Sequence, residues 1–189
     1  MKKKVLFIID PQVDFISGSL VVPGAVVAMD KLAEYLEQHG NEYDFVFITA
    51  DWHPLTHCSF TPNGGQWPVH CVQHTVGAAI HQAIINALDK IKADYDVLTK
   101  GDDENREEYS IFNNVINGTF LKDFANLEEI DSIDICGLAG DICVLNSLKD
   151  ALKAFPNTKF NVLEAFSPSI DGGKTLSEFV EKTERVNFA

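Results

Sequence analysis

The segment SIDICGLAGDICVLNSLKDALKAF, residues 132–155, contains a strand, a tight loop and a helix in direct succession. We expect the strand over Ser132–Gly137. We expect the helix over Asp141–Phe155, because its apolar residues recur at helical spacing. The loop Gly-Leu-Ala-Gly joins the two. A strand that leads at once into a helix is the repeating unit of α/β proteins. The segment therefore predicts one βα unit.

The same alternation of short apolar segments and longer amphipathic ones extends along the rest of the chain. The run Val5–Ile9 is continuously apolar, as expected of a strand that is buried on both faces. Further strands are expected at Asp44–Ala50, Tyr95–Thr99 and Lys159–Ala165. Further helices are expected at Ala25–Gly40, Val76–Ile91, Thr119–Leu127 and Gly173–Glu184. The repeated βα order predicts an α/β fold, a three-layer α-β-α sandwich with a mostly parallel central sheet.

Length and charge limit the class of protein. With 189 residues, of which 46% are hydrophobic, the chain suits one domain, residues 1–189, with a substantial core. A formal net charge of −13 argues against binding to nucleic acid and to anionic membrane surfaces, because both would repel the protein. The sequence therefore predicts a small-molecule partner rather than a polyanion.

The N-terminus and the cysteines bear on the cellular compartment. The basic start MKKK is followed by an apolar run of five residues, shorter than the roughly 7–15 residues of a secretory signal. No stretch approaches the roughly 20 apolar residues of a membrane span. Four cysteines are too few for a disulfide scaffold in a chain of this length. These features predict a soluble cytoplasmic protein with reduced thiols.

Polar side chains stand at the ends of four expected strands. Asp10 follows the first strand, Asp51 and His53 follow the second, and Lys100 follows the third. The fourth strand is followed by the loop that ends at Cys143. Ligands of open α/β sheets bind beyond the carboxyl ends of the strands, which share one edge. We therefore expect a carboxylate, a metal-binding pair, an amine and a thiol to converge there.

Cys143 has the setting of a nucleophile. It stands at the start of a helix, where backbone N–H groups lower the pKa of a thiol. Asp10 can accept its proton and Lys100 can stabilise the thiolate. Taken singly, each residue also has a plain structural interpretation: Cys143 as a small packing residue, Asp10 as a turn cap before Pro11, and Lys100 as an exposed lysine. A redox role for Cys143 would need a resolving thiol, for which Cys136 is poorly placed.

The irregular stretch 51–75 contains candidate metal ligands. Asp51 and His53 are two residues apart, so they face the same side of an extended segment, and His70 follows a glycine-rich loop. One carboxylate and two imidazoles leave positions open for water or substrate, as a catalytic site for Zn, Mn, Fe or Co requires. His57 is a further candidate ligand.

Two alternatives concern the same stretch. The pairs His57-Cys58 and His70-Cys71 suggest a closed zinc site, although adjacent ligands would strain a tetrahedron. Phe15 and Trp67 stand close in sequence to the polar set and are candidates to line a flat pocket; core packing is the other interpretation.

With these motifs the chain resembles the isochorismatase-like cysteine hydrolases, and within them the metal-binding nicotinamidases, which also act on pyrazinamide. The resemblance covers nearly the whole chain and includes a Rossmann-like fold. It is carried by FIIDPQVDF (residues 7–15), DWHP (51–54), HCSF (57–60), WPVHC (67–71), TKG (99–101) and CGLAGDICV (136–144). WPVHC after DWHP is the most specific of these, because it separates the metal-binding nicotinamidases from other amidases of the family.

The resemblance implies a role for each motif residue. Cys143 would be the nucleophile, Asp10 the general base and acid, and Lys100 their electrostatic partner. The N–H groups of Ala139 and Cys143 would form the oxyanion hole, with a cis peptide between Leu138 and Ala139.

The resemblance also implies a cofactor and a substrate site. One divalent metal ion, zinc first among Zn, Mn, Fe and Co, would be held by Asp51, His53 and His70 and would bind the pyridine nitrogen. Phe15 and Trp67 would flank the ring. His57 is a ligand in some relatives only.

Alternatives to this function stay open. The same fold hydrolyses other small amides and ureides, and a non-catalytic binding protein would keep the fold without the activity. Isochorismatases that cleave vinyl ethers do without the cysteine. Gly140 stands where the family more often has threonine. Relatives are often dimers or larger, so a homo-oligomer is expected.

Overall fold

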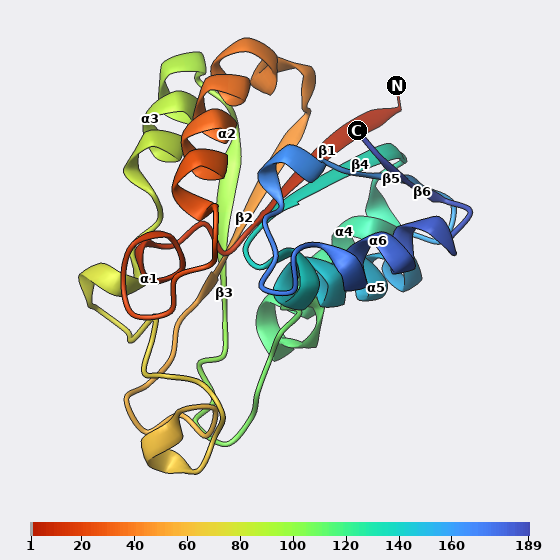
Figure 1. Cartoon of the computed structure of the whole chain (residues 1–189). Coiled ribbons are helices and arrows are strands. Elements are labelled where there is room, and N and C mark those ends of the chain that lie inside the picture. Colours follow the sequence, from red (N-terminus) through yellow and green to blue (C-terminus); the bar gives the residue numbers. More distant parts are fainter. Residues whose placement is uncertain (1) are drawn as a thin grey trace.

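The computed structural model describes residues 2–189 and contains a parallel sheet between two layers of helices (Figure 1). Within these residues the sheet has six strands in the order β3-β2-β1-β4-β5-β6, and every neighbouring pair is parallel. The strands are β1 Lys3–Ile9, β2 Phe45–Asp51, β3 Tyr95–Lys100, β4 Ile130–Gly137, β5 Lys159–Val162 and β6 Val186–Phe188. The predicted three-layer fold is confirmed, with a fully parallel sheet.

The helices divide between the two faces of the sheet. On one side lie α1 (Val13–Ile16), α2 (Ala25–His39) and α3 (Gln82–Ile91) (Figure 1). On the other lie α4 (Val115–Leu127), α5 (Leu145–Ala154) and α6 (Lys174–Glu181). None of the helices within residues 2–189 combines the length and apolarity that crossing a bilayer requires.

Strand β1 shows why the N-terminal run is continuously apolar. Leu6 and Ile8 belong to the core beneath α2 and α3, whereas Val5, Phe7 and Ile9 belong to the core beneath α4, α5 and α6. Successive side chains of a strand point to opposite faces, so a central strand covered on both faces is apolar at every position. The strand is thereby held in the middle of the sheet.

The helix expected over Val76–Ile91 begins only at Gln82, so its first part was predicted wrongly. Residues 76–78 form a short 3-10 turn. The following residues bond to the connection after β1 instead: the Val13 N–H donates to the Ala79 carbonyl at 3.0 Å, and the His81 N–H donates to the Pro11 carbonyl at 2.8 Å. These backbone hydrogen bonds replace those that a helix would make.

The C-terminal strands also differ from the expectation. Strand β5 ends at Val162 rather than Ala165, because residues 164–166 form a 3-10 turn. Strand β6, only three residues long, was not expected at all. Both differences lie at one edge of the sheet. The four strands that end next to candidate functional residues, β1 to β4, form the other part of the same sheet.

Candidate active site

Cys143 lies in a π-helical turn, Gly140–Val144, that connects β4 to α5. Its side chain is buried, with 6% of the residue exposed. The Sγ atom is 3.7 Å from the Lys100 ammonium and within 4.8 Å of a carboxylate oxygen of Asp10. Burial raises the pKa of the thiol well above its usual value; the charge of Lys100 opposes this and that of Asp10 adds to it. The side chain of Cys143 is therefore a neutral thiol next to a carboxylate.

Asp10 follows β1 with a left-handed φ of 47° and is fixed by Thr49 in β2. The Asp10 N–H donates to the Thr49 carbonyl at 3.1 Å, and the Thr49 hydroxyl donates to Asp10 Oδ1 at 2.7 Å. Oδ2 lies 2.9 Å from the Lys100 Nζ atom, yet no donor in residues 2–189 is aligned for a hydrogen bond to it. Burial raises the pKa of Asp10, and Lys100 lowers it. Oδ2 is thus able to accept a proton.

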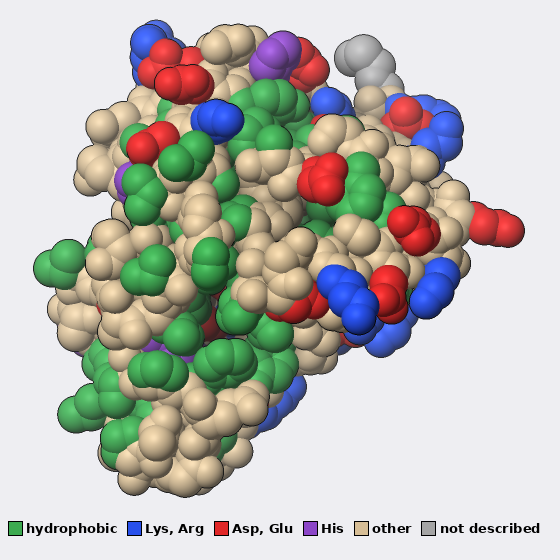
Figure 2. All heavy atoms as spheres, viewed as in Figure 1, with side chains coloured by type: hydrophobic (Ala, Val, Ile, Leu, Met, Phe, Trp, Pro, Cys, Tyr) green, Lys and Arg blue, Asp and Glu red, His purple; other side chains and the backbone are tan. Residues whose placement is uncertain are grey.

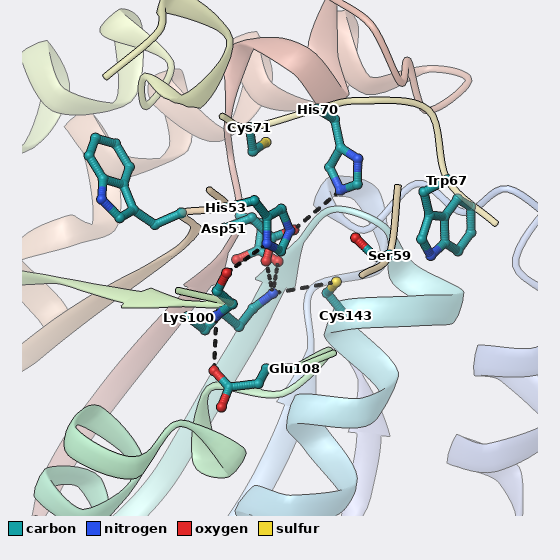
Figure 3. Close-up of polar contacts among 12 residues, drawn as sticks. Asp51, His53, Ser59, Trp67, His70, Cys71, Lys100, Glu108 and Cys143 are labelled. Atoms are coloured by element: carbon teal, nitrogen blue, oxygen red, sulfur yellow. Dashed lines mark hydrogen bonds and ion pairs between the residues drawn. The ribbon is translucent and has the colours of Figure 1, made fainter. Parts of the chain in front are cut away.

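Lys100, the last residue of β3, is fully buried and joins three groups. Its Nζ atom lies 2.9 Å from Asp10 Oδ2, 2.5 Å from Asp51 Oδ1 and 3.7 Å from Cys143 Sγ. Burial alone would lower the pKa of the lysine, but the two carboxylates raise it well above its usual value. A buried charge is tolerated where it is paired, so Lys100 is an ammonium held by two anions (Figure 3).

The three candidate metal ligands direct one atom each into a common space. His53 Nε2 and His70 Nε2 lie 3.6 and 3.9 Å from Asp51 Oδ2, and the three ligand atoms are within 4.8 Å of one another. The other ring nitrogens face backbone carbonyls: His53 Nδ1 is 2.8 Å from Gly101 O, and His70 Nδ1 is 2.7 Å from Pro68 O. An Nδ1–H that donates to a carbonyl leaves Nε2 free as a ligand. The donor set therefore fits a divalent ion.

The charge of Asp51 is firmly maintained in this arrangement. Burial acts to raise the pKa of its carboxyl, but Lys100 and His53 outweigh burial and hold the pKa below its usual range. Its two oxygens serve different neighbours, since Oδ1 faces Lys100 and Oδ2 faces the histidines. Asp51 thus connects the candidate metal ligands, His53 and His70, to Lys100 and so to Cys143. The sequence did not predict this contact.

His57 is not among the atoms that converge with Asp51. Its Nδ1 lies 2.7 Å from the Ser59 hydroxyl, and its Nε2 lies 3.0 Å from the Arg106 carbonyl. The ring packs beside that of His53, with 4.1 Å between centroids. Within residues 2–189, no group of ligand atoms close enough to share an ion includes His57, Cys58 or Cys71, so the geometry of a closed zinc site is absent there.

A pocket opens over these groups. Histidine side chains are visible in a recess between apolar side chains in the lower part of Figure 2. Phe15 lies beside His70, with 5.4 Å between ring centroids, and the Trp67 indole N–H donates to the Tyr109 hydroxyl at 3.1 Å. The pocket is lined by Phe15, Leu20, Val22, Asp51, Trp67, His70, Glu107, Tyr109, Ala139, Ile142, Cys143 and Ile170. Both predicted aromatic residues are therefore pocket residues.

The loop before Cys143 also borders the pocket. The peptide between Leu138 and Ala139 is cis, as expected. The Ala139 N–H donates to no acceptor within residues 2–189, whereas the neighbouring Gly140 N–H donates to the Pro168 carbonyl at 2.9 Å. At Gly140 a side chain would collide with the Ser167 carbonyl and the Ser169 hydroxyl, which explains the glycine. Ala139 is thus left with a free donor at the pocket wall.

A family model described as the isochorismatase domain matches residues 4–154. The chain belongs to the isochorismatase family. The nicotinamidase/pyrazinamidase of Mycobacterium tuberculosis is 35% identical over 155 residues, which cover 79% of each chain.

Solved structures of isochorismatase-type proteins agree with this assignment. The pyrazinamidase of Pyrococcus horikoshii in complex with zinc superposes with a TM-score of 0.80 at 28% identity, covering 99% of this chain and 98% of that one. PnC1 from L. infantum in complex with nicotinate superposes with a TM-score of 0.84 at 30% identity, covering 98% and 92%.

Besides Thr49, two further supporting residues of this isochorismatase-family site were not predicted. Gln12 is buried and pairs with the backbone of Asp51: its Nε2 donates to the Asp51 carbonyl at 2.8 Å, and its Oε1 accepts from the Asp51 N–H at 2.7 Å. Glu108 accepts from the Gly101 N–H at 2.9 Å (Figure 3). Gln12 stands within the FIIDPQVDF motif, which was a usable signal. Glu108 lies in a long loop without any such signal.

Proposed function

We propose that the chain is a nicotinamidase, which hydrolyses nicotinamide to nicotinate and ammonia and acts on pyrazinamide in the same way. The observation that carries the proposal is the convergence of Cys143, Asp10 and Lys100 beside a set of two histidines and one aspartate, all under one pocket. A relative described as a nicotinamidase/pyrazinamidase and a solved relative holding nicotinate support the same substrate class.

The reaction begins with proton transfer from Cys143 to Asp10. Asp10 Oδ2 takes the proton of the Sγ–H group, and the sulfur forms a bond to the amide carbon. The carbonyl electron pair moves to the oxygen, where the N–H groups of Ala139 and Cys143 donate to the oxyanion. One such donor typically contributes about 2.7–4 kcal/mol. Lys100 keeps its charge throughout and stabilises the thiolate as it forms.

The second half releases both products. The protonated Asp10 donates its proton to the amide nitrogen, the C–N bond breaks, and ammonia leaves a thioester on Cys143. A water molecule then gives a proton to Asp10 and attacks the thioester carbon. The C–S bond breaks, the proton returns from Asp10 to sulfur, and the carboxylic acid that forms loses its own proton to solvent, which leaves nicotinate.

The other residues of the site are proposed to bind the pyridine ring of nicotinamide. Asp51, His53 and His70 would hold one divalent ion, with zinc, manganese, iron and cobalt all suited to the donor set. When bound, the ion supplies a Lewis acid for the pyridine nitrogen. Phe15 and Trp67 flank the ring and limit its orientation, so that the amide carbon faces Cys143.

The test is an ammonia-release assay with nicotinamide, pyrazinamide and benzamide, with and without a chelator. We expect both pyridine- and pyrazine-type amides to be hydrolysed and benzamide to be poor, because benzamide has no ring nitrogen. The chelator should suppress the reaction. Cys143→Ala should release no ammonia while still binding nicotinamide. Equal rates for benzamide and nicotinamide, or residual turnover by Cys143→Ala, would refute the proposal.

The biological setting is part of the same proposal. Nicotinate is a precursor for NAD, so a nicotinamidase suits NAD salvage in the cytoplasm, with one domain over residues 1–189 carrying the activity. A homo-oligomer is part of the proposal only because the resemblance to the family implies one.

A further inference from the structure

The proposed reaction changes the charge of the bound molecule, and the inference below rests on that proposed function. The substrate amide is neutral, whereas the product is a carboxylate. The N–H groups assigned to the oxyanion, and the Lys100 ammonium beside Cys143, are also suited to hold a carboxylate. A divalent ion held by Asp51, His53 and His70 would attract the product carboxylate further. The Asp10 and Asp51 carboxylates offset part of this positive charge, but an ammonium and a divalent ion together exceed the charge of the carboxylates, so the loaded site would attract its own product.

Glu107 introduces an opposing charge into the pocket wall. It is half-buried and lines the same pocket as Cys143 and His70. Its Oε1 accepts from the Glu108 N–H at 3.1 Å, which limits the movement of the carboxylate. The nearby Arg106 pairs with Glu108 instead, with 3.5 Å between Nε and Oε1. Within residues 2–189, no cationic side chain comes within 4.0 Å of the Glu107 carboxylate. Its negative charge is therefore not neutralised by an ion pair.

The carboxylate also acts on the histidines of the site. Burial is the main influence on the pKa of His70 and lowers it, and the charge of Glu107 acts in the opposite direction. The same opposition applies at His57. Glu107 lines the pocket together with His70 and Cys143, although it does not contribute a ligand atom that converges with Asp51. Its position is that of a wall charge rather than a metal ligand.

We infer that Glu107 is a specificity-determining residue that disfavours anions in the pocket. It favours neutral amides over amides that carry a carboxylate near the reacting group, and it promotes departure of the carboxylate product. The reason is Coulombic: a fixed negative charge in a partly desolvated pocket repels an anion and leaves a neutral ligand nearly unaffected.

The test compares Glu107→Gln with Glu104→Gln in the zinc-loaded enzyme. The first variant removes the charge and keeps an oxygen for the Glu108 N–H. Glu104 is a matched control, because it is on the same loop but is exposed, and it accepts from the Thr56 hydroxyl at 2.6 Å outside the pocket. The measurements are the product-inhibition constant of nicotinate, the KM of nicotinamide, and zinc content by elemental analysis.

We expect the nicotinate inhibition constant to fall about five- to tenfold in Glu107→Gln, with a much smaller change in the nicotinamide KM. The difference between wild type and variant should shrink as ionic strength rises. Glu104→Gln should match the wild type. An unchanged inhibition constant, a parallel change in both constants, or loss of zinc would overturn the inference. If the wild type fails to hydrolyse nicotinamide, the proposed function is what fails, and the inference falls with it.

Discussion

Among single residues, Lys100 contacts three of the candidate catalytic and metal-binding side chains. Its ammonium is buried between Asp10 and Asp51 and lies beside the Cys143 sulfur. Burial is the main cause that raises the pKa of the Cys143 thiol; the charges of Asp10 and Asp51 add to it, and that of Lys100 opposes it. In the proposed mechanism, the charge of Lys100 then favours the thiolate that forms as Asp10 accepts the proton.

Asp10→Asn removes both the negative charge of Asp10 and its ability to transfer a proton. The two losses have opposite effects on Cys143, which can be measured separately. Burial raises the pKa of the Cys143 thiol and the charge of Asp10 raises it further, so Asp10→Asn should lower that pKa while Lys100 stays charged. A lower pKa means more thiolate at pH 7. Alkylation of Cys143 by iodoacetamide, followed by mass spectrometry, should be faster in the variant at pH 7. Nicotinamide turnover should nevertheless fall by about 10²–10⁴, because no group remains to protonate the leaving nitrogen.

The control for this experiment is Cys143→Ala, which should show no alkylation at that position. Slower alkylation in Asp10→Asn than in the wild type would contradict the assigned charges.

At the residue level, the position at the end of a strand was the strongest signal for the candidate site. Asp10, Asp51, Lys100 and Cys143 were predicted from their positions alone, since parallel strands end at one edge. Thr49 could not be recognised in this way. It is an ordinary interior residue of β2, and its contact with Asp10 spans 39 positions of sequence. Such side chains support the site through long-range contacts that the neighbouring sequence does not predict.

At the level of elements, the end of β3 is fixed by Gly101, whose backbone N–H and carbonyl each make a hydrogen bond. Its N–H donates to Glu108, its carbonyl accepts from His53, and its φ is +71°. A side chain at this position would collide with the His53 ring. Close approach and a left-handed backbone both require glycine here. One turn therefore positions Lys100, the residue before it, together with the ring of His53.

Removal of Glu108 should weaken metal binding without touching a ligand. In Glu108→Ala the Gly101 N–H loses a buried acceptor, so the carbonyl that orients His53 is less well fixed. We expect the zinc affinity to fall about tenfold, measured by competition with a chromogenic chelator. Glu108→Gln keeps an acceptor oxygen and should restore most of the affinity. Equal zinc affinity in Glu108→Ala and the wild type would show that the contact does not orient His53.

The boundaries of helices and strands were predictable where burial sets the pattern of apolar residues in the sequence. Strands β1 to β4 and helix α2 lie within a few residues of their predicted ranges. The expected helix over Val76–Ile91 failed in its first part because Ala79 and His81 bond to a distant segment, a tertiary effect that periodicity cannot reveal. Strand β6 escaped prediction because three residues are too few to show a period.

For the whole molecule, the sheet order explains how distant segments form one site. Strands β1 and β4 lie at the centre, β2 lies beside β1, β3 lies beside β2, and Asp51 is the register partner of Lys100. The metal ligands join the end of β2 to His70, which belongs to the long loop after β2. A bound ion would therefore cross-link that loop to the sheet. Metal binding should stabilise the fold as a whole, because the unfolded chain does not hold the three ligands together.

This linkage predicts a thermal shift on metal loading. A ligand at a hundred times its Kd stabilises the folded state by about 2.7 kcal/mol. In a chain of this size that corresponds to a rise in Tm of roughly 5–11 °C over the metal-free protein. His53→Ala should lose the shift, since it removes one of three ligands. His81→Ala is the matched control, because His81 pairs with Asp30, away from the site, and it should keep the full shift. A shift of equal size in His53→Ala would place the stabilising ion elsewhere on the molecule.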